Sequence, residues 1–120
     1  MGLVVDLVYI IYAINNHSMK EEIEKRQYVR FTVLDALYSQ CKGSTTKRFN
    51  LVEIASNAGI KNGTFDEVAG YLSDEKLVIA FINPGSYHCT ITHKGKKAIE
   101  FAHRFPEQAS EYFPALNEML

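Results

Sequence analysis

The stretch that decides the fold runs from residue 50 to residue 78 and reads NLVEIASNAGIKNGTFDEVAGYLSDEKLV. It begins with the signature of a helix start, because Asn50 can cap the first turn while Glu53 stands at the reciprocal position of a capping box. The helix ends at Gly59, since glycine readily takes the left-handed conformation that closes a helix. Its apolar residues recur at helical spacing and predict one buried face, made of Leu51, Ile54, Ala55 and Ala58.

A second helix follows within the same stretch. Ile60 returns to the core after the turn, and Thr64 with Glu67 forms another capping box. The inner face of this second helix consists of Phe65, Val68, Ala69 and Leu72. The stretch therefore predicts two short helices joined by a tight turn, with a strand directly behind them.

The residues that come next predict a β-hairpin and a further helix. Residues 77–82 (LVIAFI) and 87–92 (YHCTIT) have the composition of strands, and the turn NPGS joins them. Thr92 can cap the following helix, which Pro106 breaks or kinks. Residues 106–120 form a C-terminal tail with one or two more helical turns, and the inner face of the helix before it consists of Ala98, Phe101, Ala102 and Phe105.

The chain begins with an apolar run, LVVDLVYIIYAI at residues 3–14, in which Asp6 is the one charged residue. This run is too short to span a bilayer and lacks the basic region of a signal peptide. As a helix it is hydrophobic nearly all round and requires a partner surface, although a strand is also compatible with so short a run. The partner is either the core of the domain or the same segment of a second subunit, and the second subunit is favoured because exposed apolar stripes usually mark interfaces.

A longer amphipathic helix is predicted next in the chain. Residues 15–17 interrupt the apolar pattern, and Ser18 with Glu21 forms a capping box that starts the helix. Its first turns are charged, and Gly43 ends it. From Val29 onward a broad apolar face appears, consisting of Val33, Leu34, Leu37, Tyr38 and Cys41.

Residues 42–48 (KGSTTKR) form a polar loop that carries Lys42, Lys47 and Arg48. Phe49 anchors the end of this loop in the core. A short strand at residues 47–49 is expected to pair with the hairpin.

The composition indicates one folded domain over residues 1–120, with an apolar N-terminal segment (1–17), a core (18–105) and the tail (106–120). Hydrophobic residues make up 47% of the chain and charged residues 22%, as in ordinary globular proteins. The formal net charge of −1 gives no global attraction to polyanions, so any nucleic-acid contact must come from local patches. Cys41 and Cys89 belong to no CxxC pair, which favours free, partly buried thiols and a cytoplasmic location.

The sequence lacks the usual patterns of catalytic and metal sites. Its four histidines do not show the helical spacing, with an acidic neighbour, that a zinc site prefers: His17, His88, His93 and His103. It contains neither a glycine-flanked serine elbow nor a phosphate-cradling glycine loop. We therefore expect no enzyme activity, no cofactor, no metal and no membrane partner.

The order helix, helix, turn, helix, hairpin, helix resembles a winged helix-turn-helix domain. Ala55 and Gly59 are four residues apart, as in the helix-turn-helix, and Leu77-Val78 is similar to the exit into the wing. The run ITHKGKKA at residues 91–98 is similar to the LTxxGxxAL run that closes the wing in MarR- and PadR-type regulators. The resemblance covers roughly residues 28–105. It implies an α+β, mainly α fold with a three-helix core, a β-hairpin wing and extra N- and C-terminal helices.

The resemblance also implies a transcriptional regulator that binds double-stranded DNA, as a homodimer through its N- and C-terminal segments. Basic residues that bracket the predicted helix-turn-helix and the base of the wing are the expected phosphate contacts: Lys42, Lys47, Arg48, Lys61, Lys94, Lys96 and Lys97. The expected base contacts are Asn62, Thr64 and Tyr71, and the wing residues that could follow the backbone are Ser86 and Tyr87.

Two departures from the family pattern open alternatives. Lys76 stands where a glycine usually precedes the exit strand. The outer face of the expected recognition helix is acidic rather than basic, with Asp66, Glu67, Gly70, Tyr71, Ser73 and Asp74. One alternative is a winged helix that binds a protein partner through this acidic face without intrinsic DNA binding. Another is a regulator that senses a small molecule in a pocket at the dimer seam.

Overall fold

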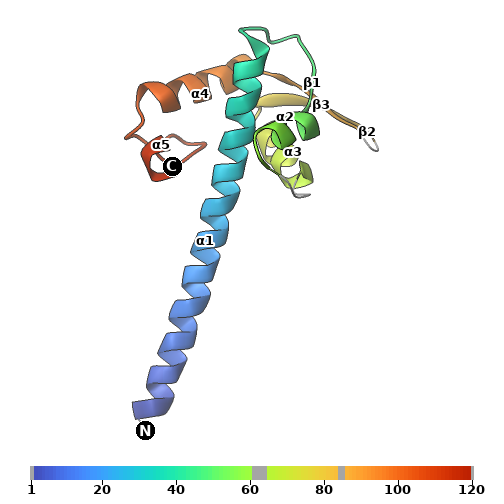
Figure 1. Ribbon diagram of the computed structural model, residues 1–120. Helices are drawn as coiled ribbons and strands as arrows, with labels where there is room; N and C mark the ends of the chain where they lie inside the picture. Colours follow the sequence, from blue (N-terminus) through green and yellow to red (C-terminus); the bar gives the residue numbers. More distant parts are fainter. Residues whose placement is uncertain (1, 61–64, 84–85, 120) are drawn as a thin grey trace.

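The computed structural model describes residues 2–60, 65–83 and 86–119 of the chain. It is an α+β structure, mainly helical, with one three-stranded antiparallel sheet of order β1-β3-β2 (Figure 1). This confirms the predicted fold class at the level of α+β, mainly α. The elements in chain order are α1 (Gly2–Cys41), β1 (Phe49–Asn50), α2 (Leu51–Asn57), α3 (Phe65–Asp74), β2 (Val78–Asn83), β3 (Ser86–Ile91), α4 (His93–Arg104) and α5 (Leu116–Met119).

The predicted interruption at residues 15–17 and the helix start at Ser18 are wrong, because α1 runs unbroken from Gly2 to Cys41. Asn, His and Ser each cost only a few tenths of a kcal/mol in a helix relative to good helix formers, roughly 0.7 at most. Nucleating a separate helix costs more than continuing through them. Further along, ion pairs at i,i+4 support the exposed turns, with Arg26 Nη2 2.9 Å from Glu22 Oε1.

The continuous helix divides the molecule into two parts. Residues 2–28 of α1 form a stalk that projects from the rest of the chain, and residues 29–60, 65–83 and 86–119 form the head (Figure 1). Within the head, α2 and α3 lie on one side of α1, and α4 and α5 lie on the other. No helix in the described part of the chain has the length and apolar composition needed to cross a membrane.

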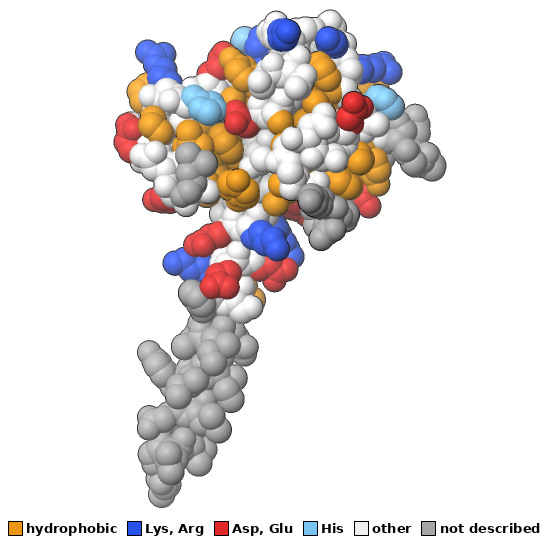
Figure 2. All heavy atoms as spheres, in the orientation of Figure 1, with side chains coloured by type: hydrophobic (Ala, Val, Ile, Leu, Met, Phe, Trp, Pro, Cys, Tyr) orange, Lys and Arg blue, Asp and Glu red, His pale blue; other side chains and the backbone are white. Residues whose placement is uncertain are grey.

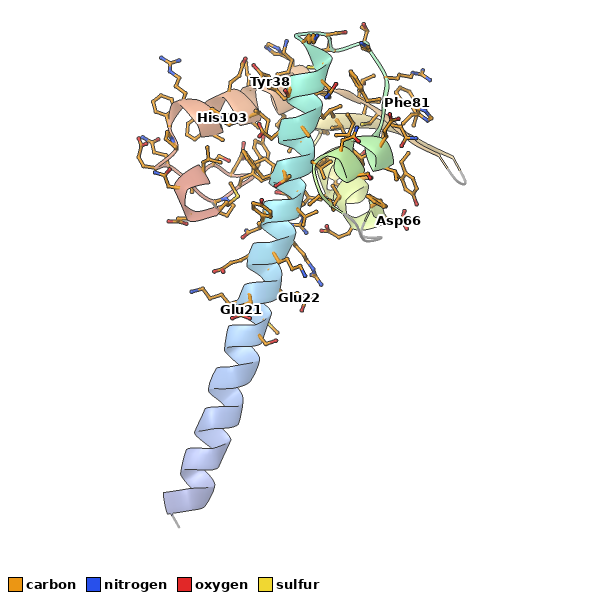
Figure 3. All side chains as sticks on the ribbon, viewed as in Figure 1. Glu21, Glu22, Tyr38, Asp66, Phe81 and His103 are labelled. Carbon is orange, nitrogen blue, oxygen red and sulfur yellow. The ribbon has the colours of Figure 1, made fainter. Side chains whose placement is uncertain are left out.

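The core of the head forms around the last third of α1. Its largest fully buried side chains come from α1, α2, α3, the sheet and α4, and they include Leu34, Leu37, Leu51, Leu72, Leu77, Ile91 and Ile99. Two polar contacts then fix α4 against α1 (Figure 3). The Tyr38 hydroxyl donates to Glu100 at 2.8 Å, and His103 Nε2 is hydrogen-bonded to Asp35 Oδ1 at 2.8 Å.

The sheet agrees with the predicted hairpin to within one residue at each strand end. Val78 pairs with Ile91 at its base, and the predicted turn residues Pro84 and Gly85 lie outside the described residues. The short strand expected at 47–49 lies instead at Phe49–Asn50, where it pairs with β3. The shift arises because Asn50 ends the strand and also caps α2, its side chain accepting from Val52 N at 3.0 Å.

The predicted free thiols and the predicted helical turn in the tail are both confirmed. Cys41 and Cys89 are free and buried, and burial raises the pKa of the Cys89 thiol to about 11. In the tail, α5 is a single turn, and Phe113 and Leu116 join the core.

The exit into β2 shows how the chain replaces the glycine that the resemblance expects. Lys76 adopts a left-handed conformation with φ of 62°. In this conformation Leu77 N donates to the Leu72 carbonyl at 2.8 Å, which closes α3. Thr92 caps α4 as predicted and also donates through Oγ1 to the Lys76 carbonyl at 2.7 Å. The turn is therefore present, and a residue with a Cβ carries it.

We expect Lys76→Gly to stabilise the protein. A left-handed residue with a Cβ costs about 1 to 2 kcal/mol, and glycine removes this cost at the expense of some chain entropy, for a net gain of about 1 kcal/mol. Urea unfolding of the two proteins measures the difference. The matched control is Glu75→Gly at the preceding position, which has no positive φ. Equal destabilisation by both substitutions would contradict the account of this turn.

Candidate nucleic-acid interface

The loop of residues 42–48 connects α1 to β1 at the end of the head that lies farthest from the stalk (Figure 1). Gly43 turns the chain out of α1 with φ of 87°. Ser44 Oγ then accepts from the Lys47 amide at 3.1 Å. Lys96 in the first turns of α4 donates through Nζ to the Gly43 carbonyl at 3.0 Å. The loop is thus tied to itself and to α4.

Two basic side chains of this loop lie over aromatic rings. The Lys47 ammonium is 5.4 Å from the centre of the Phe49 ring, and the Arg48 guanidinium carbon is 3.9 Å from the centre of the Phe81 ring. Both basic residues are exposed. Stacking orients each cation without using all of its N–H donors, so less side-chain entropy remains to be lost when an anion binds.

Together these contacts bring basic residues to one surface, which we call the basic end. Figure 2 shows Lys and Arg side chains along the end of the head opposite the stalk. The residues of the basic end are exposed except for the half-buried Lys96: Lys42, Lys47, Arg48, Lys96 and Lys97. The end consists of the loop and the adjoining turns of α4, which the Lys96 bond to Gly43 holds together.

Lys94 does not join this group. Its Nζ lies 5.2 Å from the centre of the Tyr112 ring in the C-terminal tail. A hydrogen bond with Tyr112 raises the pKa of the Lys94 ammonium. Lys94 and Lys96 are two residues apart in a helix, and residues at that spacing face different directions.

The first turn of α3 is tied to the hairpin. The Tyr87 hydroxyl donates to Asp66 Oδ1 at 2.6 Å, and the rings of Tyr87 and Phe65 are 6.4 Å apart. This hydrogen bond raises the pKa of Tyr87. In Figure 3 Asp66 lies nearer the stalk than Phe81, which Arg48 covers. The acidic start of α3 and the basic end therefore present different surfaces.

Sequence reasoning missed Arg30, which holds α3 against α1. Arg30 donates through Nε to Glu67 Oε1 at 2.8 Å, and its Nη2 bonds to the same oxygen. The Arg30 guanidinium lies over the Tyr71 ring at 4.1 Å, and the Tyr71 hydroxyl donates to the Tyr112 carbonyl at 2.7 Å. Burial, as the main cause, raises the pKa of Tyr71. The sequence does not reveal this contact because Arg30 and Glu67 are 37 residues apart.

The remaining predicted contacts stay predictions. Lys61, Asn62 and Thr64 lie outside the described residues, and only the backbone of Ser86 is described, as the first residue of β3. The predicted contact of Tyr71 with bases also stays a prediction. Its side chain is held in place by Arg30 and by the Tyr112 carbonyl. Within residues 2–60, 65–83 and 86–119, no group of three or more His, Cys, Asp or Glu side chains is arranged to hold a metal ion.

Comparison with known proteins gives no further guide to the site. No protein-family model matches the chain, and searches of curated proteins and of solved structures find no match.

Proposed function

We propose that the chain is a winged helix-turn-helix protein that binds double-stranded DNA as a homodimer and regulates transcription in the cytoplasm. Support for the fold comes from the order of α1, β1, α2, α3, β2, β3 and α4, with β1 completing the sheet beside the hairpin. The turn after α2 closes at Gly59, whose φ is 87°, as the resemblance to MarR- and PadR-type regulators implies.

The observation that carries the proposed DNA contact is the basic end. Three of its side chains project from the loop of residues 42–48, which is tied to itself and to α4, and the other two project from α4. Lys and Arg contacts to phosphate supply most of the sequence-independent affinity of DNA-binding proteins. Since Glu67 and Asp66 of α3 are engaged by Arg30 and Tyr87 and the third acidic residue, Asp74, repels phosphate, we propose that this helix contributes little direct base reading. The protein would then bind duplexes of different sequence with similar affinity.

The stalk supports the proposed dimer. Met19 is 63% exposed and Ile23 is 48% exposed, four residues apart on the same helix. The sequence N-terminal to them carries the apolar run at residues 3–14. A helix that exposes this much apolar surface is stabilised by association with a partner.

A salt series tests the proposed DNA contact. The protein is titrated into a labelled duplex of about 30 base pairs, roughly three helical turns, and the affinity is measured by fluorescence anisotropy. If each residue of the basic end neutralises one phosphate, the logarithm of the binding constant falls with the logarithm of salt with a slope of about −4 or steeper per protomer. Binding that is undetectable at about 50 mM salt, where phosphate contacts are strong, would refute the proposal.

A second candidate is a winged helix that binds a protein partner. Ile79 on the edge strand β2 is 53% exposed, and Asp66 and Asp74 leave α3 with an acidic outer surface. Such a partner would be basic with an apolar residue at its centre. A stable homodimer that shows no duplex binding at low salt would favour this candidate over DNA.

A further inference from the structure

The three-stranded sheet has one face buried on the core and one face turned to solvent. Val78, Cys89 and Ile91 are buried on the inner face. Residues that alternate with them along the strands point the other way. Of these, Ile79 is 53% exposed and His88 is also exposed. We call the solvent-facing side the outer sheet face, and its residues are Arg48, Ile79, Phe81 and His88.

The side chain of Arg48 crosses this face. Its guanidinium carbon is 3.9 Å from the centre of the Phe81 ring. β1 pairs with β3 through Phe49 and Cys89. One residue earlier in the chain, Arg48 falls opposite Thr90, and β3 lies between it and the edge strand β2. The Arg48 side chain therefore passes over β3 to reach Phe81, which accounts for the burial of Thr90 on this open face.

The outer sheet face has the chemistry of a surface for unpaired bases. Phe81 and His88 are direct cross-strand partners, so two flat rings stand on neighbouring strands. Unpaired bases stack on aromatic rings, on histidine and on guanidinium planes. No residue of β1, β2 or β3 carries a carboxylate that would repel phosphate. Arg48 also joins this face to the basic end, whose cations can hold the phosphates of a strand.

We propose that the outer sheet face binds single-stranded nucleic acid, with two successive bases on Phe81 and His88 and the phosphates at the basic end. The inference rests on the nucleic-acid binding of the proposed function and adds an unpaired strand as a ligand. In the free protein the Arg48 guanidinium occupies the ring face that a base would take. On binding, the base replaces the guanidinium, and Arg48 moves to a phosphate.

This exchange is favourable for two reasons. Stacking of a base on an aromatic ring is stronger than a cation–π contact at an exposed site. The displaced cation gains an anionic partner in return. A duplex cannot make the same contact, because its bases are stacked on one another and their flat faces are hidden. The outer sheet face therefore selects an unpaired strand.

Tryptophan fluorescence tests the proposed stacking, because the chain contains no tryptophan. Phe81→Trp places a reporter ring on the outer sheet face, and a base that stacks on an indole quenches its emission. The probe is oligo(dT) of about 12 nucleotides, within the size of one single-strand site. We expect the probe to quench the Phe81→Trp protein at about 50 mM salt, where phosphate contacts are strong.

Phe105→Trp provides the matched control for the reporter. Phe105 is also half-buried, and the Arg104 guanidinium carbon lies 5.3 Å from the centre of its ring. It stands at the other end of α4 from the basic end, just after the last residue of that helix. The probe should therefore leave the emission of this variant unchanged.

Affinity measurements provide a second test. Phe81→Leu keeps an apolar side chain but removes the ring, and His88→Ala removes the second ring at an exposed position. Loss of one stacked base should weaken binding of oligo(dT) about fivefold or more in each variant, while affinity for the duplex stays within about twofold. Urea unfolding checks that each variant folds, and His88→Ala decides the matter if Phe81→Leu does not.

Three results would overturn the inference. Unchanged affinity for oligo(dT) in the folded variants would show attraction through phosphates alone. Equal quenching of the two tryptophan proteins would show that the bases do not stack on the outer sheet face. Absence of oligo(dT) binding would leave this face to a protein partner. The salt series with duplex is a separate measurement, so duplex binding without oligo(dT) binding overturns this inference alone. Binding of oligo(dT) without duplex binding overturns the duplex contact alone.

Discussion

Replacing Gly95 with alanine is expected to lower the free energy of unfolding by about 2 kcal/mol or more, as overpacking of a well-packed site usually does. Gly95 lies in the first turn of α4 and donates its amide to Thr92 Oγ1 at 3.0 Å. A Cβ on Gly95 would overlap the Leu77 carbonyl oxygen and would approach Ile91 Cγ1 to 3.0 Å. To relieve this overlap, α4 must move away from the start of β2. This backbone contact therefore explains why the run at residues 91–98 needs a glycine at this position.

Gly70→Ala provides the matched control for this prediction. Gly70 lies in α3, and no atom lies within 4 Å of the position that its Cβ would take. Alanine favours a helix interior over glycine by about 1 kcal/mol, so this variant should be more stable than the original chain. Urea unfolding of both variants measures the contrast. The account of the close contact at Gly95 would be wrong if the two substitutions changed stability by the same amount.

The parts of the fold that were predicted correctly depend on neighbours in the sequence. The cap at Asn50, the turn at Gly59 and the cap at Thr92 each arise from a side chain and a backbone group within a few residues. The alternation in the hairpin is local as well, and its strands were placed to within one residue. Such features are readable because the groups that satisfy one another are close in the chain.

The features that were missed depend on small energies or on distant contacts. The pattern predicts a break at residues 15–17, although their helix propensities are only slightly unfavourable and α1 continues through them. The pair of Arg30 and Glu67 joins two helices that are far apart in the sequence. The residues next to Arg30 and Glu67 in the sequence do not indicate that the two side chains meet. This ion pair therefore could not be inferred from the sequence pattern.

The candidate site shows the same division. The sequence placed Lys42, Lys47 and Arg48 in one loop, and the structure has them there. It grouped Lys94 with Lys96, whereas Lys94 points to Tyr112 and Lys96 to Gly43. The helical rotation between the two lysines is regular, but the direction of each depends on where α4 sits against the loop and the tail. The grouping therefore required tertiary structure.

The second large effect concerns DNA affinity. We expect the double variant Lys47→Glu/Arg48→Glu to bind duplex DNA about tenfold more weakly or worse at low salt, since two phosphate contacts are lost and two repulsions are added. Both residues are exposed, and each lies over one aromatic ring, Phe49 for the first and Phe81 for the second. The fold should therefore tolerate the change, and far-ultraviolet circular dichroism with urea unfolding checks that it does.

The chain offers a closely matched control in Lys94→Glu/Arg104→Glu. Lys94 and Arg104 are also exposed cations that lie over aromatic rings, those of Tyr112 and Phe105. The two double variants change the net charge equally, so a general electrostatic effect would weaken both to the same extent. If DNA binds specifically at the basic end, only the Lys47→Glu/Arg48→Glu variant loses affinity for the duplex.

The most direct measurement is therefore the ratio of the two duplex affinities, determined by fluorescence anisotropy at about 50 mM salt with the same duplex. The proposed interface predicts that the Lys47→Glu/Arg48→Glu protein binds about tenfold or more weakly than the Lys94→Glu/Arg104→Glu protein, and that the latter stays within about threefold of the original chain. Equal affinities for the two variants would contradict the assignment of DNA binding to the basic end.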